Sequence, residues 1–151
     1  MTPLFKKLNF KDQKAIYIIN APKSLDDELE VMKQFTAIHK ALDDKEINFI
    51  MVFATKQEEI DNSISIIYPK LEGDAILWYC YPKGTSKKYT CEFNRDNGWK
   101  AIGKYNLEPV RQIAIDEDWS ALRFRKTDYI KKLTRSNSFA LSAEGKRRTA
   151  R

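Results

Sequence analysis

The chain has 151 residues, of which 42% are hydrophobic and 32% are charged, and this suits one folded domain better than a disordered chain. No apolar run approaches the length of about 18 residues that a membrane-spanning helix needs, and no apolar signal core follows Met1. The two cysteines are too few for a disulfide scaffold or a four-thiolate zinc site, so we expect a cytoplasmic protein with reduced thiols.

The positive charge is concentrated at the C-terminal end. Residues 126–151 contain eight Lys and Arg against two acids, which equals the whole net charge of +6 and leaves residues 1–125 neutral. The sequence therefore predicts one domain over 1–126 and a basic extension over 127–151. Such an extension can bind nucleic-acid phosphates or an acidic protein, can act in solubility, or can dock on the domain as a helix. The candidate nucleic-acid-binding residues are Lys131, Lys132, Arg135, Lys146, Arg147 and Arg148.

The first half of the chain alternates between buried strands and helices. Residues 1–13 are a polar lead-in, and the continuous apolar run over 15–20 predicts a strand buried on both faces. We expect a helix over about 25–34, a short strand over 35–42, a turn over 43–46 and a second buried strand over 47–54. A second helix starts near Thr55, where Glu58 has a capping-box spacing, and ends near Pro69.

The second half ends in a hairpin. A turn over 71–74 leads into a third buried strand over 75–81, followed by a loop over 82–88 and a helix over 95–105. Strands over 110–115 and 119–125, joined by the acidic turn 116–118, predict an antiparallel hairpin at the sheet edge. The alternation in 119–125 predicts one solvent-facing side, and a further helix is expected over 128–135. This order predicts a three-layer α/β fold with a mixed sheet, mostly parallel with a C-terminal antiparallel hairpin.

In such a fold, ligands bind at the carboxyl ends of the strands. Three polar loops meet there in the predicted topology, and each brings a lysine. Lysine side chains, with a glycine and hydroxyl groups in the last loop, could bind a phosphate or carboxylate, or could simply face solvent. The candidate cleft residues are Asn20, Lys23, Thr55, Lys83, Thr85 and Ser86.

Several kinds of chemistry are disfavoured. The only histidine, His39, falls in a predicted strand, which excludes a multi-histidine metal site and argues against a hydrolytic triad. Cys80 falls in a buried strand, and Cys91 has no activating base beside it. We therefore predict no catalytic residue and no metal site. The polar cluster 94–99 is either a binding loop using Arg95 and Asp96, or a turn in which these two residues pair and Trp99 packs in the core; we favour the turn.

Two stretches carry a family resemblance. Residues 71–83 resemble the fourth strand of class I methyltransferase folds, and residues 98–124 resemble their terminal helix and hairpin. More closely, the chain resembles a small bacterial family of unknown function that is similar to a shortened Rossmann-like methyltransferase fold. The resemblance covers about residues 10–126. The residues that carry it are Tyr81-Pro82-Lys83, Asn94-Arg95-Asp96, Gly98-Trp99 and the segments 110–116 and 119–125.

The resemblance implies a fold and not an activity. In methyltransferases a glycine loop after the first strand cradles S-adenosylmethionine, and an acid after the second strand holds the ribose. Here the first loop is Asn20-Ala21-Pro22-Lys23, without glycine, and the acid could only be Asp43 or Asp44. We therefore expect no cofactor.

These observations leave three hypotheses. The first is a bacterial, non-catalytic binding or interaction module whose partner is unknown and which could form an oligomer. The second is a divergent S-adenosylmethionine-dependent transferase that uses the cleft near Lys23, Thr55 and Lys83. The third is nucleic-acid binding through the basic C-terminal extension.

Overall fold

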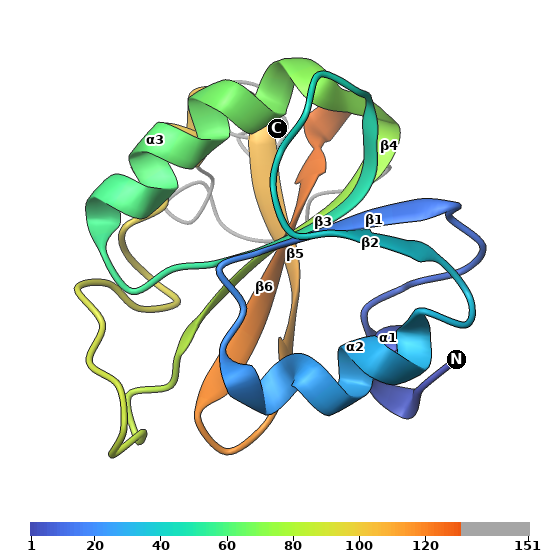
Figure 1. Cartoon of the computed structure of the whole chain (residues 1–151). Helices are drawn as coiled ribbons and strands as arrows, with labels where there is room; N and C mark the ends of the chain where they lie inside the picture. The colour runs from blue at the N-terminus through green and yellow to red at the C-terminus, as the bar shows by residue number, and fades with distance from the viewer. Residues whose placement is uncertain (131–151) are drawn as a thin grey trace.

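The computed structural model describes residues 1–130, and its six strands form one mixed sheet (Figure 1). The strands are β1 (Ala15–Ile19), β2 (Ala37–His39), β3 (Ile47–Phe53), β4 (Leu71–Pro82), β5 (Leu107–Ala114) and β6 (Trp119–Lys126). The same residues contain the α-helices α1 (Pro3–Lys7), α2 (Asp26–Met32), α3 (Gln57–Ile67) and α4 (Lys100–Gly103). Short 3-10 helices are η1 (Lys23–Leu25), η2 (Tyr68–Lys70) and η3 (Thr127–Tyr129).

The strand order across the sheet is β2-β1-β3-β4-β6-β5. The pairs β1–β2, β1–β3 and β3–β4 are parallel, whereas β6 is antiparallel to both β4 and β5. This confirms the predicted mixed sheet with its C-terminal antiparallel hairpin. The chain moves outward from β1 to β2 and then crosses back to β3 on the other side of β1. The carboxyl ends of β1 and β3 therefore flank the point where the strand order reverses, which is where α/β sheets form a ligand crevice.

Helices cover both faces of the sheet and make three layers: in Figure 1, α3 lies above the sheet and α1 and α2 lie below it. Side chains of β3 alternate between these layers, because successive residues of a strand point to opposite faces. The buried cluster on the α3 side includes Ile50, Val52, Ile60, Ile64, Leu77 and Tyr79. The cluster on the α1–α2 side includes Phe5, Leu29, Met32, Met51, Phe53 and Trp78. Burial on both faces explains the continuous apolar runs of β1, β3 and β4.

The N-terminal segment is part of the core, so the predicted polar lead-in is wrong. Thr2 caps α1 by accepting a hydrogen bond from the Phe5 N–H through Oγ1, at 3.2 Å. Phe5, Leu8 and Phe10 are all buried. The indole N–H of Trp78 donates to the Leu8 carbonyl at 2.9 Å, which fixes this segment to the middle of β4. Contacts this distant in sequence leave no periodic signal in a helix of five residues.

Three element boundaries also differ from the prediction. The strand expected over 35–42 is limited to β2, and the helix expected over 95–105 is limited to α4. The turn expected over 71–74 is instead an irregularity at the start of β4, because the register changes from Ile47↔Leu71 to Phe49↔Ile76. The bulge accommodates Gly73, whose φ of +56° favours glycine.

The C-terminal hairpin has the predicted turn but not the predicted wet face. Asp116 Oδ1 accepts the N–H groups of Asp118 and Trp119, both at 2.8 Å, and this closes the turn. The first four residues of β6, beginning with Trp119, are all buried. The reason is that β6 lies between β4 and β5 in the sheet and its Trp119 packs edge-on against Phe53. None of the helices in residues 1–130 combines the length and hydrophobicity needed to cross a bilayer.

Candidate ligand-binding site

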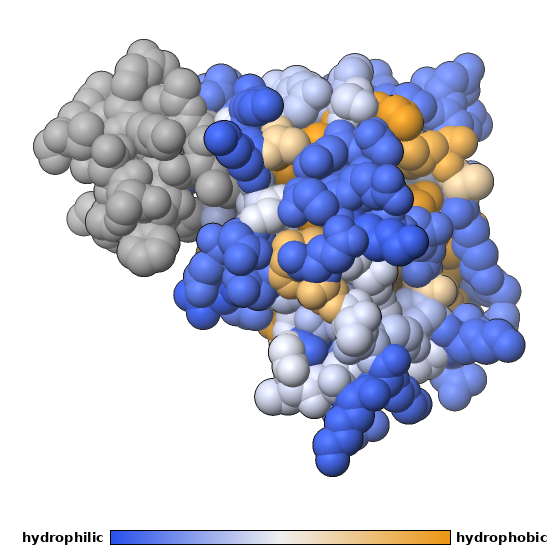
Figure 2. Space-filling model, turned by 90° about the vertical axis from the view of Figure 1, so that its left-hand side faces the viewer, coloured by the Kyte–Doolittle hydropathy of each residue, from blue (hydrophilic) through white to orange (hydrophobic). Residues whose placement is uncertain are grey.

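The loops after β1, β3 and β4 lie on one side of the sheet, at the left in Figure 1. They lie together because the three strands are parallel neighbours, so their carboxyl ends share one edge. Figure 2 looks onto this side of the molecule and shows mostly hydrophilic side chains with smaller hydrophobic areas between them. Two cavities open at this edge.

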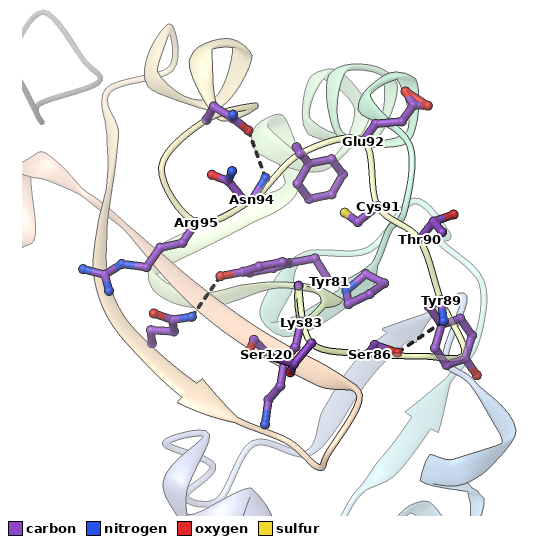
Figure 3. Close-up of a pocket in the computed structure, with 16 residues that line it drawn as sticks. Tyr81, Lys83, Ser86, Tyr89, Thr90, Cys91, Glu92, Asn94, Arg95 and Ser120 are labelled. Atoms are coloured by element: carbon purple, nitrogen blue, oxygen red, sulfur yellow. Dashed lines mark hydrogen bonds between the residues drawn. The ribbon is translucent and has the colours of Figure 1, made fainter.

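The larger cavity has a volume of about 780 Å³ and lies beyond the end of β4 (Figure 3). Most of its wall is the segment that connects β4 to α4, and Gln112 of β5 and Ser120 of β6 complete it. This volume falls within the range of roughly 300–1,000 Å³ that is usual for small-molecule sites. The cavity is therefore large enough for a ligand of drug or metabolite size.

Tyr81 forms the aromatic floor of the larger cavity. Its ring is buried and lies 5.9 Å from the ring of Phe93 and 5.6 Å from that of Trp99. Its hydroxyl accepts a 2.9 Å hydrogen bond from Gln112 Nε2. Burial raises the pKa of Tyr81 to about 12, so the hydroxyl is neutral at physiological pH. Tyr81 thus offers a ring face and a neutral hydroxyl, and it is not a general base.

The charged residues of the larger cavity are Lys83, Arg95 and Glu92. In Figure 3, Glu92 lies on the opposite side of the cavity from Lys83 and Arg95, and its carboxylate points away from them. Glu92 Oε1 also accepts the Gln57 N–H at 3.3 Å, which directs it toward the start of α3. No ion pair joins Lys83 or Arg95 to a carboxylate among the described residues. The side of the cavity away from Glu92 is therefore positive.

The smaller cavity, of about 240 Å³, lies at the ends of β1 and β3, where the strand order reverses. Its lining is Asn20, Pro22, Phe53, Ala54, Thr55, Glu59, Tyr89 and Trp119. Tyr89 also lines the larger cavity, so the two spaces are neighbours. The indole N–H of Trp119 is buried and has no hydrogen-bond acceptor within residues 1–130. A buried donor without an acceptor is costly, so a ligand or water oxygen would be favoured there.

The structure brings together five of the six cleft residues named from the sequence. Lys83, Thr85 and Ser86 line the larger cavity, Asn20 and Thr55 line the smaller one, and Lys23 lines neither. Their roles differ, because Ser86 and Thr55 form hydrogen bonds that hold loops in place.

Ser86 and the segment after Thr55 are used structurally. Ser86 Oγ donates to Asp118 Oδ1 at 2.8 Å and accepts the Tyr89 N–H at 3.2 Å, so it ties the β4 loop to the β5–β6 turn. Glu59 Oε1 accepts the N–H groups of Thr55 and Lys56, both at 3.0 Å, at the start of α3. The capping acid is therefore Glu59, one residue after the Glu58 that the sequence indicated.

The cluster 94–99 combines parts of both sequence hypotheses. Trp99 is buried and its indole N–H donates to the carbonyls of Asn94 and Arg95, which agrees with the predicted turn. The expected pairing of Arg95 with Asp96 is wrong, because no ion pair joins them. Arg95 lines the larger cavity instead. The aromatic residues Tyr89, Phe93 and Trp119 were not predicted as site residues. The closeness of Tyr89 and Phe93 to the end of β4 is a signal for those two, whereas Trp119 comes from the start of β6.

The loop after β1 does not fit the adenosyl cofactor that methyltransferase folds bind. Asn20 has a φ of +60°, the left-handed conformation in which glycine is favoured, so the chain makes the sharp turn without glycine. Two residues later, Pro22 has no N–H to donate and its ring lines the smaller cavity. This loop therefore offers fewer backbone donors and less space than a glycine-rich loop.

Asp43, one of the two acids that could correspond to the ribose-binding acid, is also engaged elsewhere. Asp43 Oδ1 accepts the Tyr17 hydroxyl at 2.6 Å and the Lys45 N–H at 3.0 Å, and the Asp43 carbonyl accepts from Lys70. The hydrogen bond from Tyr17 lowers the pKa of Asp43. Asp43 and Asp44 line neither cavity. The residues present therefore do not fit S-adenosylmethionine, and no methyl-transfer step follows from them.

The remaining reactive residues have structural surroundings. The His39 ring stacks on Tyr17 at 5.1 Å in β2, as expected for a structural histidine. Cys80 is buried, and burial raises the pKa of both Cys80 and Cys91, which disfavours the thiolate. Residues 1–130 hold no group of three or more His, Cys, Asp or Glu side chains placed to bind a metal.

The predicted nucleic-acid-binding residues lie outside the described residues. Lys131, Lys132, Arg135, Lys146, Arg147 and Arg148 all fall within 131–151. The boundary between a domain over 1–126 and a basic extension over 127–151 stays a prediction for the same reason.

The chain is similar to several solved structures. A SAM-dependent methyltransferase from Aquifex aeolicus matches with a TM-score of 0.50 and 8% identity, over 81% of this chain and 87% of that one. The N-methyltransferase NodS from Bradyrhizobium japonicum gives 0.48 and 14% identity over 74% and 84% of the two chains. An rRNA methylase from Streptococcus thermophilus gives 0.48 and 9% identity over 83% and 97%.

No protein-family model matches the chain, and no curated protein matches it. At such low identity the structural likeness concerns the fold alone. The chain thus has a Rossmann-like α/β fold similar to that of SAM-dependent methyltransferases.

Proposed function

We propose that this protein is a non-catalytic binding module that takes a small anionic molecule with a planar apolar part in the larger cavity. The observation that carries the proposal is the lining of that cavity: an aromatic floor at Tyr81, with two cations, Lys83 and Arg95, on the side away from Glu92. Aromatic rings provide apolar contact area, and the ammonium and guanidinium groups bind a carboxylate, sulfonate or phosphate.

The residues around the cavity support binding more than catalysis. Tyr81 is neutral because its pKa is raised to about 12, and the pKa of the Cys91 thiol is raised by partial burial. A general base or nucleophile works best with a pKa near the working pH, and both groups are shifted away from it. Glu92 is occupied by the backbone of Gln57.

The test uses 8-anilinonaphthalene-1-sulfonate, an aromatic sulfonate with the proposed ligand chemistry. We expect saturable fluorescence enhancement with one molecule bound per chain, and energy transfer from Trp99 in the core beneath the cavity. The double variant Lys83→Gln with Arg95→Gln should weaken binding by about tenfold or more, because charge-assisted contacts to the sulfonate are lost.

A matched double variant separates this site from nonspecific dye binding. Lys33→Gln with Lys40→Gln removes two exposed cations, neither of which lines the larger or the smaller cavity. We expect it to bind the dye like the unmodified protein. Equal binding by both double variants would refute a site at Lys83 and Arg95.

A thermal-shift titration tests the alternative of a divergent SAM-dependent transferase, which the fold similarity makes the natural competitor. A ligand at about one hundred times its Kd adds about 2.7 kcal/mol to the free energy of unfolding. In a domain of this size the midpoint would rise by about 3 °C per kcal/mol. We expect no saturable shift with S-adenosylmethionine or S-adenosylhomocysteine, and a clear shift would favour the transferase.

A further inference from the structure

Two arginines on the β5–β6 hairpin share one neutral hydrogen-bond acceptor. Arg111 of β5 and Arg123 of β6 are direct register partners in the antiparallel pair. Nη1 of Arg111 lies 3.4 Å from Asn9 Oδ1, and Nη1 of Arg123 lies 3.3 Å from the same oxygen. The two cationic nitrogens are therefore less than about 7 Å apart, with a single amide oxygen between them.

The positive charge of this pair is not balanced by a carboxylate. The nearby acid, Asp74, is engaged by Arg125, which donates to it from Nε at 2.9 Å and from Nη2 at 2.6 Å. Neither Arg111 nor Arg123 forms an ion pair within residues 1–130. Like charges at this separation repel, and an amide oxygen carries no charge to offset the repulsion.

Arg123 also has unused hydrogen-bonding capacity. Its Nε is buried and has no acceptor among the described residues. Burial lowers the pKa of Arg123, while Asp74 raises it and the neighbouring Arg125 and Arg111 lower it further. The guanidinium group remains charged, so it lies in a place where an added anion would be favourable.

The three side chains are held by rigid parts of the fold. Arg111 and Arg123 lie on paired strands. Asn9 has a φ of +67°, its N–H donates to the Lys6 carbonyl at 3.1 Å, and its neighbour Leu8 is fixed by Trp78. A pre-formed site loses little conformational entropy when a ligand binds.

We propose that Arg111, Arg123 and Asn9 form a binding site for a phosphate group. A phosphate presents several oxygens to two guanidinium groups at once, and guanidinium groups match this geometry with paired N–H donors. The site is independent of the proposed function, because Gln112 lines the larger cavity while Arg111, the residue before it in β5, points to the opposite face of the sheet.

The first experiment follows the arginine Nε–Hε signals by NMR during a titration of the full chain with inorganic phosphate, with sodium chloride keeping the ionic strength constant. We expect saturable shifts of the Arg111 and Arg123 signals. Arg111→Gln, at an exposed position, should keep the fold and weaken phosphate binding about tenfold or more.

The control variant is Lys104→Gln, which removes one exposed charge beside α4 on the other face of the sheet. It should bind phosphate like the unmodified protein. Shifts that do not saturate, or an unchanged affinity in Arg111→Gln, would overturn the proposal.

Two further ligands distinguish the sources of the phosphate. Glycerol phosphate represents a small phosphorylated molecule, and a short oligothymidylate represents the backbone of nucleic acid. If Arg111→Gln weakens the binding of both glycerol phosphate and oligothymidylate, the site binds phosphates of either source. If this variant loses glycerol phosphate binding but binds oligothymidylate as before, the site binds small phosphorylated molecules.

Discussion

The hydroxyl of Tyr17 donates a 2.6 Å hydrogen bond to Oδ1 of Asp43, and this ties the middle of β1 to the connection between β2 and β3. Asp43 is one of the two acids that could have held a ribose after the second strand. Because Oδ1 of its carboxylate accepts two hydrogen bonds inside the structure, a ribose hydroxyl would have to compete with Tyr17 for that oxygen. The contact therefore connects the stability of the sheet to the lack of fit for S-adenosylmethionine.

The Tyr17–Asp43 contact predicts an unusual alkaline titration. Burial first, and then the hydrogen bond and charge of Asp43, raise the pKa of Tyr17 from 10.0 to about 12. Because the folded pKa lies above the unfolded one, the stabilisation is complete below pH 10 and is lost as the pH rises toward 12. Absorbance titration, with Tyr17→Phe to assign the signal, should show a late phenol ionisation.

The variant Asp43→Asn separates the contribution of the acid from that of burial. It should lower the pKa of Tyr17 while leaving it above the unfolded value, since burial remains. Asp12→Asn, at an exposed position, should not change the titration. Ionisation of Tyr17 near pH 10 in the unmodified protein would contradict the partly buried hydrogen bond between Tyr17 and Asp43.

The N-terminal helix should contribute strongly to folding. Phe5 is fully buried, and its ring lies 6.1 Å from the ring of Phe49 in β3. Phe5→Ala would leave a cavity and should lower the free energy of unfolding by about 3–5 kcal/mol in chemical denaturation. Its exposed neighbour supplies the control: Lys6→Ala should change stability by less than about 0.5 kcal/mol. Equal, small effects would mean that α1 is not part of the core.

The elements that could be predicted are those with a local signal. Continuous apolar runs revealed β1, β3 and β4 because each strand is buried between two helical layers. The spacing of Ile60, Ile64 and Ile67 revealed α3, and Pro69 marked its end. The alternation in 119–125 predicted the hairpin correctly, but the predicted solvent-facing side of this strand is wrong. Alternation does not reveal whether a strand lies at the edge or inside a sheet, and β6 lies between β4 and β5.

The features that could not be predicted depend on contacts distant in the sequence. The rings of Phe10 and Phe49 have centroids 6.1 Å apart, although no pattern in the sequence links these two positions. The candidate site is similar: topology predicted which strand ends would meet, and so placed Asn20 beside Thr55. It did not predict Tyr89 beside Trp119, whose rings lie 5.0 Å apart, since a long loop brings them together.

Gly98 should be required for the wall of the larger cavity. Its φ is +92°, and a Cβ there would lie 2.5 Å from the Phe93 Cβ. Gly98→Ala should lower the free energy of unfolding by about 2–4 kcal/mol through backbone strain and overlap, and should weaken dye binding in the cavity. Gly84 lines the cavity itself and has no atom within 4 Å of an added Cβ, so Gly84→Ala should change stability by less than about 1 kcal/mol. Equal effects of the two variants would contradict this wall structure.

Cys91 should react slowly with thiol reagents despite its partial exposure. Partial burial raises its pKa, so a smaller fraction is thiolate at pH 8 than in free cysteine. In the native protein, Ellman's reagent should modify Cys91 more slowly than free cysteine, and Cys80, which is fully buried, only after unfolding.

Two further measurements make the cysteine prediction specific to the cavity. Cys91→Ser should abolish the native reaction, whereas Cys80→Ala should leave its rate unchanged if the fold is retained. Because Cys91 lines the larger cavity, the aromatic sulfonate should slow the reaction further as it saturates the protein. A native reaction as fast as that of free cysteine would contradict the raised pKa of the partly buried thiol. A rate unaffected by bound dye would place the dye elsewhere.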